Sequence, residues 1–243
     1  MHWRDEGIVL SVRPHGESSA VVHLLTREHG RHGGLARGAL GSRHRGLFQP
    51  GNLVAATWSG RLAEHLGNYV CELVEAHAAR VLDDPARLAA LSAAAAVSER
   101  ALPEREPHLA CYEGFRALLE ALPGAHWAEV YVRWELALLA ELGFGLDLAA
   151  CAAGGGNDQL AYVSPRSGRA VSLAAGAPYR DRLLALPGFL AGRGGGGPEE
   201  VGAGLALTGF FLERHVFAPH HQPLPAARQR LAERFPAALS AAG

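Results

Sequence analysis

Short apolar segments separated by glycine-containing turns make up residues 1 to about 76. Five of them have strand length and are mostly rich in β-branched or aromatic residues; they cover residues 7–12, 18–26, 33–40, 52–58 and 66–73. No helical period lies between them, so the pattern predicts five short strands in a small closed or nearly closed β-barrel. An SH3-like barrel would give a similar pattern, and the strand count alone does not settle the topology.

Helical patterns replace the strands from Asp84 onward. Pro85 suits the first turn of a helix, and the Ala-rich stretch to Arg100 has strong helix propensity. Further helices are predicted over residues 108–122, 127–142, 205–217 and 226–235. The Gly-rich stretches 154–157 and 192–204 are predicted as breaks, the second as a mobile surface loop.

Aromatic side chains follow one face of the helix predicted over residues 127–142. Trp127, Tyr131, Trp134, Leu138 and Leu142 recur at steps of three or four residues. Such a stripe is a candidate surface for bases or a peptide. Core packing is the favoured interpretation, because a helix this apolar must be buried against its neighbours.

Composition indicates a globular chain: 49% of the 243 residues are hydrophobic and 19% are charged. No apolar run approaches the roughly 18 residues that cross a bilayer, and no secretory signal is visible at the N-terminus. Three cysteines, Cys71, Cys111 and Cys151, are too few and too widely spaced for a disulfide framework. We therefore expect a soluble cytoplasmic protein.

Charge is distributed unevenly along the chain. All 23 basic residues are arginines, and 24 acidic residues leave a net charge of −1. Between residues 27 and 61 a single acid, Glu28, accompanies six arginines, namely Arg27, Arg31, Arg37, Arg43, Arg45 and Arg61. Acids outnumber bases over residues 62–106, so the basic charge is concentrated near the N-terminus.

Motifs of catalysis are missing from the sequence. It contains no HExxH, CxxC, GxSxG or phosphate-loop pattern. Scattered surface positions explain the thirteen histidines better than a metal site does. Packing roles are the favoured interpretation for Cys71 and Cys111. We therefore expect neither an enzyme nor a small-molecule substrate.

A binding signal lies in residues 37–51, RGALGSRHRGLFQPG, which contain three arginines, four glycines and no acid. Such a loop can follow a phosphate backbone, because glycine permits close approach and a guanidinium binds phosphate through two parallel hydrogen bonds. His44, Phe48 and Trp58 are candidate stacking faces. A solvated hairpin loop is the competing interpretation.

Ordered blocks across about 210 residues resemble the bacterial recombination mediator family RecO. They include the Gly-Glu-Ser turn at 16–18, LLTREHG at 24–30, ELGFGLDLAAC at 141–151, YVSPRSGRAVS at 162–172 and LTGFFLERHVF at 207–217. The resemblance implies an α+β multidomain fold, with an OB-fold DNA-binding domain at 1–80 and a mainly helical domain at 81–243. The last two blocks are its most specific matches.

Function and partners also follow from this resemblance. It implies binding to single- and double-stranded DNA, annealing of complementary strands, and, with RecR, loading of the RecA recombinase. It further implies contact with the single-strand-binding protein, near the nucleoid, with RecF as a further candidate partner and without a cofactor or a membrane. Arg116 and Arg133 are candidates to receive the acidic tail of the single-strand-binding protein, although a solvated face is the favoured interpretation for both.

A degenerate zinc-module-like insert at 151–175 departs from the family pattern. Zinc-binding relatives carry two CxxC pairs there, whereas this chain has Cys151 with Gly154, and Ser172 with Ala175. Tetrahedral zinc needs four ligands, so one thiolate cannot hold it. We predict no zinc, and expect backbone pairing around residues 162–171 to maintain the turn.

The six arginines of residues 27–61 are the predicted DNA-binding residues. They would hold the phosphate backbone of a single strand and leave its bases free to pair. Two hypotheses from other classes stay open: an RNA-binding OB-fold module, and a protein-interaction scaffold in which the arginines are incidental.

Overall fold

A computed structural model describes residues 1–42, 44, 46–154 and 159–235 of the chain. It divides into two compact units, one of Met1–Ala125 with Pro225–Arg228 and one of His126–Leu224 with Gln229–Gly243. Within the described residues, no helix is long and apolar enough to cross a membrane. The predicted domain boundary at residue 80 stays a prediction.

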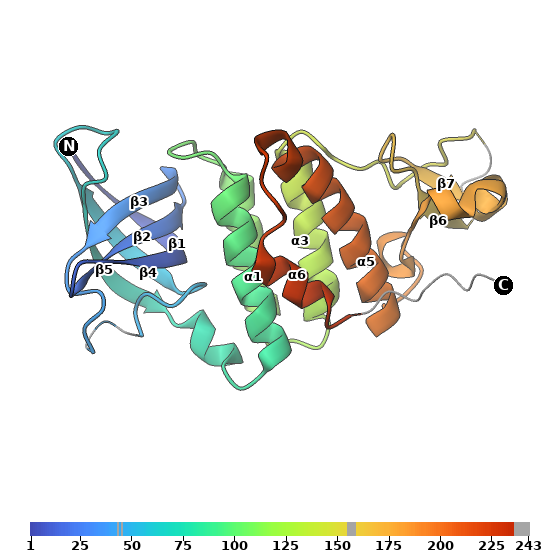
Figure 1. Cartoon of the computed structure of the whole chain (residues 1–243). Coiled ribbons are helices and arrows are strands. Elements are labelled where there is room, and N and C mark those ends of the chain that lie inside the picture. Colours follow the sequence, from blue (N-terminus) through green and yellow to red (C-terminus); the bar gives the residue numbers. More distant parts are fainter. Residues whose placement is uncertain (43, 45, 155–158, 236–243) are drawn as a thin grey trace. The chain divides into compact units, whose positions relative to one another are not determined.

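Five strands form the closed barrel of the first unit, in the order β1-β2-β3-β5-β4 (Figure 1). They are β1 (His2–His15), β2 (Ser19–Thr26), β3 (Gly30–Ala36), β4 (Leu53–Ser59) and β5 (Asn68–Glu75). Only the contact between β3 and β5 is parallel. This strand order is that of an OB-fold, which confirms the predicted barrel and decides its topology.

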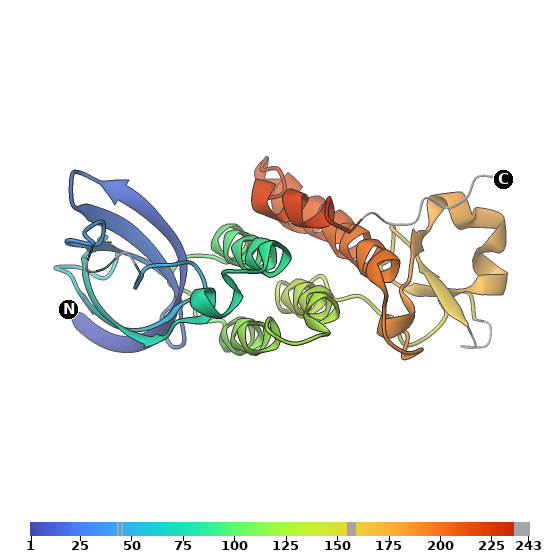
Figure 2. The same cartoon turned by 90° about the horizontal axis from the view of Figure 1, so that it is seen from below.

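The first strand begins at His2, before the predicted start at residue 7. The prediction relied on apolar residues, and the start of this strand is polar. Residues 2–8 pair with β4, from His2 opposite Ser59 to Ile8 opposite Leu53. From Gly7 onward the same strand pairs with β2, and its register shifts between Val9 and Ser11. One long, bulged strand thus pairs with both β2 and β4 and closes the barrel. Figure 2 shows the curvature of the barrel strands. Backbone pairing, not an apolar pattern, makes residues 2–6 a strand.

The two longer helices of the first unit lie where they are predicted. The α1 helix (Pro85–Ala101) begins at Asp84, whose carboxylate accepts the N–H groups of Ala86 and Arg87. The α2 helix is Leu109–Ala121, and the short η1 helix (His77–Val81) joins the barrel to α1. The α1 helix packs against β1 and β2.

The second unit consists of two long helices and a small sheet. The α3 helix (Trp127–Glu141) packs against α5 (Pro198–Phe211). The sheet has the order β7-β6-β8. Its strands are β6 (Leu160–Val163), β7 (Ala170–Ser172) and β8 (Leu184–Ala185), and the shorter helices are α4 (Leu173–Gly176), η2 (Ala177–Arg182), η3 (Gly188–Leu190), η4 (Leu212–Phe217) and η5 (Ala218–His220). The α6 helix (Ala226–Ala232) is divided between the units, since residues 226–228 belong to the first and residues 229–232 to the second.

The loop prediction for residues 192–204 is wrong from residue 198 onward, where α5 already begins. Pro198 occupies the first turn, and Glu199 and Glu200 follow it, a favourable combination at a helix N-terminus. Gly204 has a packing reason, because a β-carbon there would lie 3.0 Å from Cγ1 of Val132 on α3. Gly204 therefore permits close packing of α5 on α3.

Core packing is confirmed for the aromatic stripe of α3. Trp127, Tyr131, Trp134 and Leu138 are all buried. The Tyr131 and Trp134 rings lie 5.4 Å apart, so the stripe offers no open surface to bases.

Gly30 should be far less tolerant of substitution than Gly16, although both have a left-handed φ, of 65° and 69°. A β-carbon at Gly30 would lie 2.0 Å from the backbone oxygen of Glu106, whereas one at Gly16 meets nothing within 4 Å. We expect Gly16→Ala to cost roughly 1–2 kcal/mol in unfolding free energy, and Gly30→Ala to cost about 3 kcal/mol or more. Urea unfolding measures both; equal costs would contradict the close approach of residue 106 to the barrel.

Candidate nucleic-acid interface

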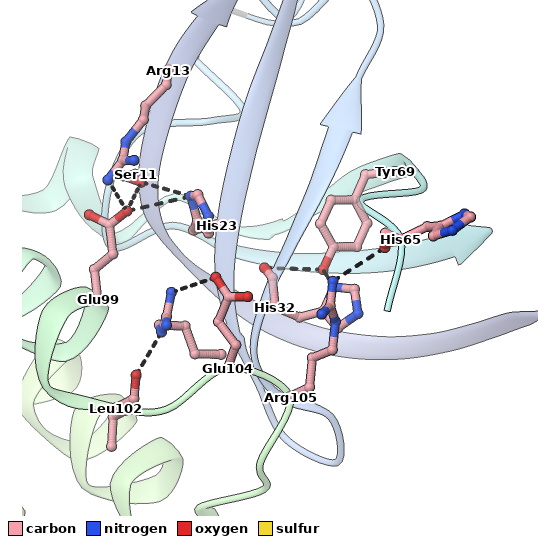
Figure 3. A network of polar contacts seen from close by, with 11 residues as sticks. Ser11, Arg13, His23, His32, His65, Tyr69, Glu99, Leu102, Glu104 and Arg105 are labelled. Atoms are coloured by element: carbon pink, nitrogen blue, oxygen red, sulfur yellow. Dashed lines mark hydrogen bonds and ion pairs between the residues drawn. The ribbon is translucent and has the colours of Figure 1, made fainter. Parts of the chain in front are cut away.

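An acidic segment, residues 99–113, covers the β1-β2-β3 face of the barrel (Figure 3). Glu99 at the end of α1 accepts hydrogen bonds from Ser11 Oγ at 2.5 Å and from Arg13 Nη2 at 2.8 Å. Its carboxylate also lies 3.4 Å from Nδ1 of His23. Side chains of β1 and β2 are thus already bound to a carboxylate of the same chain.

Arg31 on β3 is committed to the same segment. Its Nε donates to the carbonyl of Leu102 at 2.7 Å, and its Nη1 pairs with Glu104 at 3.1 Å. Its carbonyl accepts the N–H of Arg105 at 2.8 Å. Strands 2 and 3 form the usual ligand face of an OB-fold; here residues 99–113 occupy part of that face.

The other predicted arginines differ in their availability. Arg27 is half exposed and lies 3.5 Å from Glu113. Arg37 and Arg61 are exposed, and their side chains make no hydrogen bond or ion pair with any other residue that the structure describes. Arg43 and Arg45 lie outside the described residues.

Strand pairing brings Arg37 and Arg61 to one end of the barrel. Ala36, the last residue of β3, pairs with Tyr69, and Ser59, the last residue of β4, pairs with Asn68. The loops that follow these strands, residues 37–52 and 60–67, therefore leave the barrel side by side. We call these two loops the basic rim.

A cavity of about 420 Å³ opens at the basic rim, lined in part by Arg37, His44 and Tyr69. Two of the predicted stacking residues are buried, because Phe48 is 7% and Trp58 is 1% exposed. Both pack into the barrel core, so the prediction that they present stacking faces is wrong. Trp3, whose ring lies 5.8 Å from that of Trp58, is half-buried and is not among the predicted stacking residues.

His32 on β3 is buried, beside Tyr69 and Arg105 (Figure 3). Its Nδ1 lies 3.1 Å from the hydroxyl of Tyr69. Burial, reinforced by the charge of Arg105, lowers the pKa of His32 to about 4. The ring is therefore neutral at physiological pH.

Cysteine and carboxylate chemistry gives no sign of catalysis in the described residues. Burial raises the pKa of the Cys71 thiol to about 12, so it is not a nucleophile. Glu75, His77 and Glu120 form the one group there with metal-like geometry. Arg80, however, lies 3.3 Å from Nδ1 of His77 and 3.0 Å from Glu120. A guanidinium can only donate, so Nε2 of the neutral ring carries the proton toward the carboxylates and is not a free metal ligand.

Hydrogen bonds link the four positions where zinc-binding relatives have thiolates. Cys151 Sγ accepts the Ser172 N–H at 3.3 Å, and Ser172 Oγ accepts the Ala175 N–H at 3.4 Å. The Gly154 N–H reaches the Cys151 carbonyl at 3.3 Å. The predicted backbone pairing is confirmed, since Tyr162 pairs with Val171. One thiolate, one capping hydroxyl and two residues without side-chain donors do not fit a zinc ion.

Arg133 in the second unit is only partly solvated. Its Nη2 donates to the Phe189 carbonyl at 3.0 Å, and its guanidinium lies 5.1 Å from the centroid of the Phe189 ring. Arg116 on α2 is half-buried.

Comparison with known proteins covers the whole chain. The family model described as Recombination protein O N terminal matches residues 1–77, and that of Recombination protein O C terminal matches residues 82–223. The chain belongs to the RecO family. A DNA repair protein RecO of Rhodospirillum centenum is 59% identical over 100% of this chain and 98% of its own length. Those of Rhodospirillum rubrum and Methylobacterium nodulans are 53% and 50% identical, over 97% and 94% of this chain and 96% of each relative. A role in DNA repair and recombination follows.

Acid should destabilise this RecO-family chain partly through His32. The folded protein holds the pKa of His32 near 4, below the ordinary 6.5. Between these values the unfolded chain binds a proton that the folded chain does not, so stability falls as the pH drops from 6.5 toward 4. At pH 5 the loss from this residue is about 2 kcal/mol relative to pH 7.

Urea unfolding at pH 7 and pH 5 measures that loss in the wild type, in His32→Gln and in His220→Gln, which changes an exposed histidine. His32→Gln should reduce the pH dependence, and His220→Gln should not. An unchanged pH dependence in His32→Gln would contradict the burial of a neutral ring.

Chelation should leave the chain unaffected, because hydrogen bonds replace the thiolates of residues 151–175. We expect the same thermal midpoint with and without EDTA, and substoichiometric zinc by elemental analysis of protein refolded with zinc. Stoichiometric zinc with a midpoint lowered by EDTA would contradict the assignment.

Proposed function

We propose that this RecO-family protein is a non-catalytic recombination mediator that binds single- and double-stranded DNA through the basic rim. It anneals complementary strands and, with RecR, helps to load RecA onto DNA covered by single-strand-binding protein. The observation that carries the proposal is a pair of exposed arginines on two adjacent loops of the barrel, Arg37 and Arg61, whose side chains pair with no other described residue. Arg43 and Arg45 belong to the first of these loops.

Binding in this proposal is electrostatic. Arginines of the basic rim neutralise phosphates and release counterions, so affinity falls as salt rises. Contacts of this type lie on the backbone and leave most base edges free for a complementary strand, which annealing requires. No cofactor and no small-molecule substrate take part.

Arg27 and Arg31 have a smaller part than the rim arginines. For Arg31 to reach a phosphate, its bonds to Leu102 and Glu104 would have to break. Arg27 would have to leave Glu113. We therefore assign Arg31 mainly to holding residues 99–113 on the barrel, and Arg27 to a secondary DNA contact.

Partner binding belongs to the same proposal. The acidic, apolar tail of the single-strand-binding protein docks on the helical region, with Arg116 and Arg133 as candidate contacts. RecR binds the protein in the cytoplasm at the nucleoid, and RecF is a further candidate partner.

Charge reversal on the basic rim tests the DNA contact. Fluorescence anisotropy with a labelled single-stranded oligonucleotide across a salt series compares the wild type with Arg37→Glu/Arg61→Glu and with Arg43→Glu/Arg45→Glu. Each phosphate contact on a single strand contributes about 0.7 to the slope of log K against log [salt]. With contacts from all six predicted arginines, the wild-type slope should be no steeper than about −4. The slope of each double variant should be shallower by about 1.4. Each double variant should also bind the oligonucleotide with lower affinity than the wild type.

Arg180→Glu/Arg182→Glu is the matched control, because it reverses two exposed charges in the second unit. It should bind as the wild type does. Folded wild-type protein without DNA binding at low salt would favour the scaffold hypothesis, and a preference for RNA of the same sequence would favour the RNA-binding hypothesis.

A further inference from the structure

Residues 103–107, with the sequence Pro-Glu-Arg-Glu-Pro, connect α1 to α2 along the start of β3. We call this segment the strap. All five of its residues are exposed, so it buries no apolar side chain that would fix it on the barrel. It pairs with β3 at a single bridge, between Glu104 and Arg31. A segment with so few buried apolar contacts belongs to the low-stability part of a structure and can open locally.

Three hydrogen bonds join the strap to the barrel among the described residues (Figure 3). The Arg105 N–H donates to the Arg31 carbonyl at 2.8 Å, and Arg31 Nη1 donates to Glu104 at 3.1 Å. Arg105 Nη2 donates to the carbonyl of His65, in the loop 60–67, at 3.3 Å. Glu104 is 46% exposed, and exposed ion pairs contribute little to stability. Arg105 also has a φ of 61°, which costs free energy as long as the strap stays on the barrel.

The strap and the residue before it occupy one guanidinium of the barrel. The side chain of Arg31 is only 16% exposed. Its Nε is bound by the Leu102 carbonyl and its Nη1 by the Glu104 carboxylate. Two neighbouring oxygen acceptors of this kind replace the pair of oxygens that a phosphate offers to an arginine. Because β2 and β3 form the usual ligand face of an OB-fold, the strap takes the place of a phosphate on that face.

We propose that the strap is an autoinhibitory element that competes with a phosphate of single-stranded DNA for Arg31. In the closed state Arg31 bonds to Leu102 and Glu104. In the open state the strap leaves β3, and Arg31 turns to a phosphate. The inference rests on the proposed function, to which it adds a form of regulation. Since a contact at Arg31 requires opening, the barrel holds a strand more weakly than its arginines would allow.

A double-mutant cycle tests this competition. Glu104→Ala removes the acceptor on the strap, so the affinity for a labelled single-stranded oligonucleotide at low salt should rise roughly 2- to 5-fold. In Arg31→Ala/Glu104→Ala this gain should be absent relative to Arg31→Ala, because the arginine that the strap releases is missing. A gain of the same size with and without Arg31 would overturn the proposal.

Glu72→Ala is the matched control for the change in net charge. Glu72 is exposed on β5 and makes no ion pair with any residue that the structure describes. Any gain from Glu72→Ala is general electrostatics and should be equal with and without Arg31. If the gains from Glu72→Ala and Glu104→Ala depended on Arg31 to the same extent, the strap would not be the competitor.

Hydrogen exchange follows the strap in the wild type, without any substitution. The Arg105 amide should exchange several-fold faster when single-stranded DNA is saturating, because its bond to Arg31 then opens. The Leu35 amide is the internal control, since it donates to Gly67 at 3.1 Å where β3 meets β5 and should not exchange faster. Unchanged or slower exchange at Arg105 would contradict opening. If a variant of the cycle does not fold, this measurement decides the proposal.

The outcomes distinguish the two proposals. Folded wild-type protein that binds no DNA at low salt would overturn the proposed function, and the strap's role with it. Wild-type binding with an additive cycle, or with a strap that stays closed at saturation, would overturn autoinhibition alone and leave the contacts of the basic rim in place.

Discussion

Ion pairs and hydrogen bonds between residues 99–113 and the β1-β2-β3 face determine where this barrel can bind anything else. The carboxylate of Glu99 accepts hydrogen bonds from Ser11 and Arg13 and lies beside His23. The Leu102 carbonyl and the Glu104 carboxylate accept hydrogen bonds from Arg31. Exposed ion pairs alone contribute little. Here they accompany the approach of Glu106 to Gly30 and the packing of α1 on two strands. The usual OB-fold ligand face is thereby partly filled by the chain itself.

The uneven charge along the sequence acquires a structural meaning from this contact. Basic residues of 27–61 and acidic residues beyond 62 read as separate groups, yet Arg31 pairs with Glu104 and Arg27 with Glu113. Part of the basic charge is therefore already paired with acidic residues of the same chain. Arg37 and Arg61, which have no such partner among the described residues, lie on the loops of the basic rim. The four of these arginines that the structure describes look equivalent in the sequence and are unequal in availability.

Features set by local sequence were predictable, and features set by distant partners were not. Strand patterns and the Asp84–Pro85 start of α1 gave the barrel and the first helices. The polar start of β1 escaped because residues 2–6 become a strand only through β4. Burial of Phe48 and Trp58, and the fixing of Trp3 between His29 and Trp58, likewise depend on residues tens of positions away. Glycine-rich composition hid the start of α5, whose N-terminal signal is Pro198 with two glutamates.

An annealing protein must hold a strand and still leave its bases free, and contacts to phosphates meet both requirements. Phosphate contacts at a few arginines are weak individually and depend on salt, so the strand can be exchanged. Because contacts to the phosphate backbone leave most base edges open, a complementary strand can pair while the first strand is still held. Exchange of the strand then follows from the weakness of each contact, without any chemical step.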